Sequence, residues 1–370
     1  SVVGEGRRFV AKNPARYSLI SLALVQTAPA SGRGRTHVHA HIVTVEAIEA
    51  YIAQLQPGGC LAVIQNTATL ADATEVTVRT AAQRTTGALH VARWELRQPD
   101  LPDGTRNPFA HLITVHVGVR QGGVARNQRA AAAALGAGLV ARETAHNGSN
   151  DTVRAATDDR PFLFVAERQT PLHVPIAIAA ALLGFAMLTR RLRRRGQSVR
   201  WPLVGFLAGA AAMGLQVLAV QCGQLALGDP VQAWSWSLAA VLGGSALGAI
   251  LLGPRLANDA VVAALACAGV LVVLATRIWL LGDFDGSGAA LVWVAVGAMP
   301  AGLPFLAAVN RSRADGLHEG VVIGADALGG VLGASLTLLV ALTFGFSALW
   351  WLLCGLFAST ALVGITRSRI

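Results

Sequence analysis

The sequence has 370 residues, of which 54% are hydrophobic and only 14% charged, and its mean hydropathy is +0.53. Soluble domains carry about 25% charged residues, so this composition excludes a protein that is soluble throughout, and a disordered one. Thirty basic against twenty acidic residues give a net charge of +10, and Lys12 is the only lysine. A basic excess suggests nucleic acid in a soluble protein, but in a membrane protein arginines mark cytoplasmic loops. We therefore predict a membrane protein that binds the lipid bilayer and no nucleic acid.

Residues 1–170 predict an α/β domain, because short apolar runs alternate with stretches of helical spacing. This alternation favours a mostly parallel sheet with helices covering its faces, and no internal repeat is evident. The expected strands lie at 17–25, 60–65, 88–96, 111–119 and 160–165. The expected helices lie at 44–55, 71–83 and 127–139.

Residues 171–370 predict an all-α transmembrane bundle, because each apolar run is about 20 residues long, enough to cross the hydrocarbon core as a helix. The last two runs are separated by little more than a turn at Gly345, so the bundle has six or seven helices. The runs are 171–189, 201–227, 233–253, 259–281, 289–309, 319–344 and 347–365.

The connections between these runs alternate in charge, which predicts an orientation by the positive-inside rule. The first connection holds five arginines within 190–195, and Arg255, Arg311 and Arg313 lie in later alternate connections. The opposite connections hold Asp229, Asp283 and Asp285 and no lysine or arginine. With seven spans, residues 1–170 are then extracytoplasmic. For the arginines of 190–195 we favour this role in orientation alone over the binding of anionic lipid heads.

Several motifs follow one another in an order that resembles a known family. They are Gly-Glu-Gly-Arg-Arg-Phe at 4–9, the apolar run 17–25, Thr-Val-Glu-Ala at 44–47, Leu-Gln-Pro-Gly-Gly-Cys-Leu-Ala at 55–62 and Thr-Asp-Asp-Arg-Pro-Phe at 157–162. Together they resemble the second half of a spermidine synthase domain. Segments 227–230, 302–305 and 329–333 are similar to patterns in bacterial membrane-fused members, which implies a protein of the bacterial inner membrane.

The resemblance implies a Rossmann-like, methyltransferase-type fold that transfers an aminopropyl group from decarboxylated S-adenosylmethionine to putrescine. It places Glu5 and Gly6 at the cofactor. The carboxylates expected in the family fall on Ser18, Ala23 and Gln26. An amine nucleophile must lose a proton and needs a carboxylate within about 3 Å, so the resemblance predicts a protein without catalytic residues.

The Gly-rich cofactor loop of the family is expected upstream of Gly4, so we expect a piece of a longer protein or a domain completed by another polypeptide. As the sequence stands, we expect no cofactor. Our first hypothesis is a catalytically degenerate accessory or structural subunit, partnered by other membrane proteins. The second is an active aminopropyltransferase, or a related S-adenosylmethionine-dependent transferase, that needs its N-terminal half. The third is a polyamine or small-cation transporter.

Two further groups of residues have alternative interpretations. His37, His39 and His41 alternate, which would place three imidazoles on one face of a strand; we favour a solvated loop over a metal site. Gln216, Gln221 and Asp326 lie within apolar runs, where they favour interhelical hydrogen bonds over a site for a proton or small cation.

Overall fold

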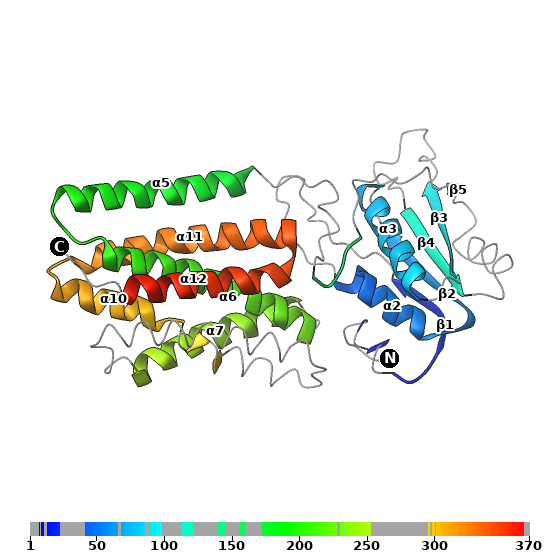
Figure 1. The fold of residues 1–370 in the computed structure, drawn as a ribbon. Helices are drawn as coiled ribbons and strands as arrows, with labels where there is room; N and C mark the ends of the chain where they lie inside the picture. The colour runs from blue at the N-terminus through cyan, green and yellow to red at the C-terminus, as the bar shows by residue number, and fades with distance from the viewer. Residues whose placement is uncertain are drawn as a thin grey trace, which may run out of the picture. The chain divides into compact units, whose positions relative to one another are not determined.

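The structure is a computed structural model, and the chain divides into two compact units, Ser1–Gln169 and Thr170–Ile370 (Figure 1). Each unit is described by itself below. The residues that the structure describes are 7, 9–10, 13–22, 41–65, 68–85, 89–97, 113–120, 140–144, 155–159, 172–227, 230–252, 295–296, 298–299 and 301–365.

The first unit contains a sheet in the order β1-β2-β4-β3-β5. Only β1 and β2 are parallel neighbours, while β2 with β4, β4 with β3 and β3 with β5 are antiparallel. The strands are β1 (Tyr17–Leu22), β2 (Leu55–Gln65), β3 (Leu89–Arg97), β4 (Ile113–Arg120) and β5 (Val140–Thr144).

The predicted mostly parallel sheet is therefore wrong for three of the four neighbouring pairs. The reason is β4, which lies between β2 and β3 in the sheet and runs antiparallel to both. The third antiparallel pair is formed by β5 at the edge, next to β3. Because β2 and β3 are both antiparallel to β4, and β1 is parallel to β2, the strands β1, β2 and β3 run in one direction. The predicted strand at 160–165 and helix at 127–139 lie outside the described residues.

Two helices connect the three co-directional strands. Helix α2 (Val45–Ala53) lies between β1 and β2, and α3 (Ala68–Arg84) lies between β2 and β3. A short 3₁₀ turn, η1 (His41–Val43), precedes α2. The core between sheet and helices is apolar, as its largest fully buried side chains show: Val43, Ile48, Tyr51, Leu55 and Leu61.

The second unit is a helical bundle in which five described helices are long and apolar enough to cross a membrane. This result confirms five of the seven predicted runs, and 259–281 lies outside the described residues. Gly345, with φ +90°, separates the last two helices, so they are not one span. The five are α5 (His173–Arg194), α6 (Arg200–Leu227), α7 (Pro230–Leu252), α11 (Glu319–Phe344) and α12 (Phe346–Ile365).

The predicted single span at 289–309 is wrong, because the described residues there contain a break. Met299, Ala301 and Gly302 form a turn, and helix α10 (Leu303–Ala314) starts after it. Pro304 lies in the first turn of α10, where its missing N–H costs nothing, but it could not lie within a continuous helix without removing a hydrogen bond. At 12 residues, α10 is too short to cross a bilayer.

Helices α6 and α11 pack backbone to backbone. A Cβ added to Gly329 or Gly333 of α11 would collide with the carbonyl oxygen of Phe206 or Ala210 in α6. In the other direction, one added to Gly209 would collide with the backbone of Asp326. Residue numbers rise together along both helices at these contacts, so α6 and α11 run parallel.

The bundle contains one local arrangement twice. Helices α5 and α10 both end in arginines and in a glycine with positive φ, Gly196 at +65° and Gly316 at +72°. In both turns the residue after the glycine donates its N–H to a carbonyl five residues earlier, at 3.0 and 2.8 Å. Each turn leads into one of the two parallel helices, and α5 contacts α11 while α10 contacts α6.

We expect Gly329→Ala to destabilise the bundle by about 1–3 kcal/mol, because the new methyl group must push α11 away from α6. Gly324→Ala is the matched control in the same helix, since a Cβ there meets nothing within 4 Å. This control should keep or slightly raise stability through its better helix propensity. Thermal unfolding in detergent, followed by circular dichroism, measures both; equal midpoints would contradict the packing.

Candidate functional site

The strand that the resemblance assigns to catalysis is β1, at one edge of the described sheet. Ser18 lies in β1 and is exposed, as is Leu19, which is 58% accessible. The other two expected carboxylate positions, Ala23 and Gln26, lie outside the described residues, as do Glu5 and Gly6. The structure therefore places one of these five residues, and its side chain is a hydroxyl.

A charged cluster lies at the start of α2. Asp158 accepts hydrogen bonds from both terminal nitrogens of Arg7, at 2.7 and 2.5 Å, and from the Thr44 hydroxyl at 2.7 Å. Its own backbone N–H donates to Glu46 at 2.8 Å. The two charged side chains are about a quarter exposed, so solvent screens their ion pair only in part. Both carboxylate oxygens of Asp158 are thus engaged.

Local sequence explains how these residues meet. Thr44 is the N-cap of α2, and its hydroxyl oxygen accepts the Ala47 N–H at 3.2 Å. The Val45 N–H donates to the Ala156 carbonyl at 2.8 Å, and the Ala156 N–H donates to the Thr77 hydroxyl at 2.9 Å. Residues 155–159 are therefore held against α2 and α3. Both 44–47 and 157–162 stand out as sequence motifs, but nothing in the sequence indicates that they touch.

The cluster lies at the carboxyl end of β1. Helix α2 ends next to the start of β2, and Tyr17, the first residue of β1, donates its N–H to Gln54 at 2.8 Å. Because the end of α2 is beside the amino end of β1, the start of α2 is toward the opposite end. In sheets with helical crossovers, ligands bind at the carboxyl ends of the strands.

The described residues of the first unit hold no group of three His, Cys, Asp or Glu side chains that could bind a metal. His37 and His39 lie outside those residues, and His41 begins η1. Cys60 is buried in β2, and burial raises the pKa of its thiol, so it is protonated at neutral pH.

The three polar residues predicted within spans are spread along the bundle. Gln221 is 2% accessible, whereas Gln216 and Asp326 are partly buried. A Cβ on Gly209 would lie 2.8 Å from the Asp326 carboxylate, which places Asp326 at the interface of α6 and α11. At 1.5 Å per residue, Gln216 and Gln221 lie about 10 and 18 Å further along α6. They therefore do not form one site with Asp326.

Polar contacts also close the end of the bundle at which α6 begins. The Trp201 indole N–H donates to Asp315 at 2.6 Å, and the Arg200 guanidinium lies 4.3 Å from the centre of the Trp201 ring. Arg200 also donates to the carbonyls of Val363, at 3.3 Å, and Gly364. A cavity of about 440 Å³ adjoins these groups, lined by Gly196, Gln197, Ser198, Arg200, Trp201, Arg311, Asp315 and Leu317. The sequence shows the charges but not this connection to α12.

No protein-family model, no curated protein and no solved structure matches the chain. Functional inference therefore depends on the geometry described above and on the motif resemblance.

We expect Asp158→Ala to lower the free energy of unfolding of the first unit by about 2 kcal/mol, since it removes the charge-assisted hydrogen bonds that Asp158 accepts from Arg7 and Thr44. Glu49→Ala is the control, because Glu49 is 3.9 Å from Arg84 in a more exposed ion pair that contributes about 0–1 kcal/mol. Unfolding of the full chain in denaturant, monitored by hydrogen exchange of the backbone amides of α2, measures the difference in unfolding free energy between the two variants. Equal destabilisation by the two variants would contradict a role for Asp158 in holding residues 155–159 against the start of α2.

Proposed function

We propose that this protein is a catalytically degenerate spermidine synthase-like protein of the bacterial inner membrane, serving as an accessory or structural subunit of a membrane protein complex. The observation that supports this proposal most is that Asp158 and Glu46, at the carboxyl end of β1, are engaged in hydrogen bonds within the fold. Asp158 is occupied by Arg7 and Thr44, and Glu46 accepts the backbone N–H of Asp158.

The chemistry of aminopropyl transfer explains why this matters. The attacking amine must be deprotonated, and a positioned carboxylate can orient it and take the proton. Ser18 stands on β1 where the resemblance expects such a group, and a serine hydroxyl is not a base at neutral pH. The sequence likewise gives Ala23 and Gln26, neither of which is ionisable.

The course of the chain supports the Rossmann-like part of the proposal. Strands β1, β2 and β3 run in one direction, and α2 and α3 lie between them in sequence, which makes a βαβαβ order. Half of a Rossmann-type domain has this order. Strand β4 is inserted between β2 and β3, and the edge strand β5 extends the sheet beyond β3.

The parallel packing of α6 and α11 supports the proposed orientation. Because both helices start at the same end of the bundle, the arginine-rich ends of α5 and α10 lie at that end too. By the positive-inside rule this end is cytoplasmic. Helix α5 runs toward it, so residues before α5 start from the extracytoplasmic face.

We expect no spermidine when the purified protein is incubated with decarboxylated S-adenosylmethionine and putrescine, because Ser18, Ala23 and Gln26 stand where the resemblance expects the carboxylates. Ala23→Asp alone should also be inactive. Mass spectrometry of the products measures this, with an active soluble spermidine synthase as the positive control. Spermidine formed by the natural sequence would overturn the proposal in favour of an active transferase.

One observation favours a second candidate, a transporter of polyamines or small cations. A helix that ends in arginines occurs twice, and each time it is followed by one of the two mutually parallel helices α6 and α11. A turn also precedes α10 within an apolar segment. Many transporters contain such paired units and interrupted helices. Asp326, at the interface of α6 and α11, would be the counter-charge for a cation.

Our first proposal predicts that proteoliposomes containing the protein take up labelled putrescine no faster than empty liposomes. If it is a transporter instead, uptake is measurable and Asp326→Asn reduces it about tenfold or more, whereas Glu319→Gln at the exposed start of α11 does not. Uptake with this pattern of variants would replace the subunit proposal by the transporter.

A further inference from the structure

We propose that the C-terminal end of α5 binds the phosphate of an anionic membrane phospholipid through Arg190, Arg193 and Arg194, with the acyl chains of the lipid along the apolar face of the same helix. This inference is independent of the proposed function, because it concerns only the bundle. It assigns a ligand to a surface that the other contacts of the bundle leave open.

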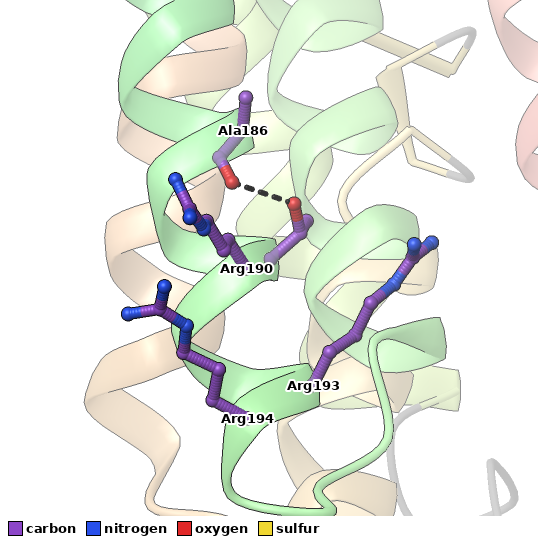
Figure 2. Close-up of a pocket in the computed structure, with 5 residues that line it drawn as sticks. Ala186, Arg190, Arg193 and Arg194 are labelled. Atoms are coloured by element: carbon purple, nitrogen blue, oxygen red, sulfur yellow. Dashed lines mark hydrogen bonds between the residues drawn. The ribbon is translucent and has the colours of Figure 1, made fainter.

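The three arginines line one hollow. Its volume is about 460 Å³, and its remaining lining residues are Ala186 and Thr189, all from the last turns of α5. Figure 2 shows Arg190 and Arg194 leaving the helix on one side and Arg193 on the other. A hollow with several guanidinium groups and no carboxylate is suited to a phosphate, which guanidinium groups bind through paired hydrogen bonds.

No acidic side chain among the described residues neutralises these charges. All three arginines are exposed, and none of their guanidinium groups forms an ion pair or hydrogen bond with another described residue. The arginines of the neighbouring turns differ: Arg200 binds the end of α12, and Arg313 pairs with Glu319. The end of α5 is thus a place where positive charge is left for an external anion.

The apolar surface of α5 leads to the same hollow. Leu183 and Met187 are 62% and 60% accessible, and with Arg190 and Arg194 they follow the spacing i, i+4, i+7 and i+11. Residues at this spacing share one helix face. Ala181 and Leu192, which are buried, lie on the opposite face. A lipid could therefore place its chains on Leu183 and Met187 and its phosphate between Arg190 and Arg194.

Two features of the hollow restrict the class of ligand that it can bind. The Thr189 hydroxyl already donates to the Ala186 carbonyl at 2.9 Å, so the donors left for a ligand are the guanidinium groups (Figure 2). These groups recognise a phosphate rather than a sugar or choline group. The adjoining apolar face favours a phosphate that carries acyl chains over a free phosphate ion, which would leave Leu183 and Met187 uncovered.

Arginines at a helix C-terminus also complement the helix dipole, and cytoplasmic arginines set orientation. Those effects depend on the number of charges and their distance from the helix end. They do not depend on which side of the helix carries the charge. Arg191 and Arg195 provide the comparison, because they belong to the same turns but do not line the hollow.

The test compares two double variants of the full-length protein, Arg190→Gln with Arg194→Gln, and Arg191→Gln with Arg195→Gln. Both remove two positive charges from the same helix end. Native mass spectrometry of the protein in detergent measures the binding of phosphatidylglycerol and of phosphatidylcholine with identical acyl chains. A third arm adds millimolar inorganic phosphate to the protein with bound phosphatidylglycerol.

We expect the first double variant to bind phosphatidylglycerol about tenfold more weakly or worse, and the second to stay within about twofold of the natural sequence. Phosphatidylcholine should bind the natural sequence no better than phosphatidylglycerol binds the first variant, and inorganic phosphate should not displace the lipid. Equal losses in both variants, or equal binding of the two lipids, would overturn the proposal. Displacement by inorganic phosphate would replace it by a site for a soluble phosphate.

Discussion

The architecture of the bundle depends on the backbone contact between α6 and α11. When two apolar helices associate inside a bilayer, they gain no hydrophobic free energy, because lipid tails are as apolar as leucine. Their association therefore relies on close packing. Glycines allow this packing: Gly329 and Gly333 fit against α6, and Gly209 fits against α11. The same contact places Asp326 at a helix interface rather than toward lipid, which reduces the cost of a carboxylate at that position.

The parallel direction of α6 and α11 also determines where the charges gather. Two parallel neighbours that are far apart in sequence must each be preceded by a turn at the same end of the bundle. Both turns carry arginines and a glycine with positive φ, and they meet where Trp201 binds Asp315. The charges of the two turns, the contact of Arg200 with α12 and the exposed arginines of α5 therefore lie at one end of the bundle, because α6 and α11 pack parallel to each other.

Sequence patterns predicted those features that depend on local composition. The run 319–344 matches α11 at both ends, because a long apolar segment follows His318, whose side chain accepts the Gly320 N–H as the N-cap. The prediction of a single span at 289–309 was wrong, because a hydropathy average over this segment does not detect the turn that precedes Pro304. The sheet failed for a different reason: apolar spacing identifies a strand but carries no information about its neighbour. For the same reason, the bond between Arg7 and Asp158, 151 residues apart, could not be foreseen.

In the first unit, the contacts that complete the fold and those that would perform chemistry draw on the same residue type. A carboxylate that accepts hydrogen bonds from two guanidinium nitrogens and a hydroxyl is held in one position, and its oxygens have little capacity left for a substrate amine. Asp158 is in this state, and it anchors residues 155–159 to the start of α2. Where the resemblance expects a base on β1, Ser18 offers a hydroxyl. The residue that fastens this segment to the start of α2 is thus a carboxylate whose two oxygens are both engaged within the fold.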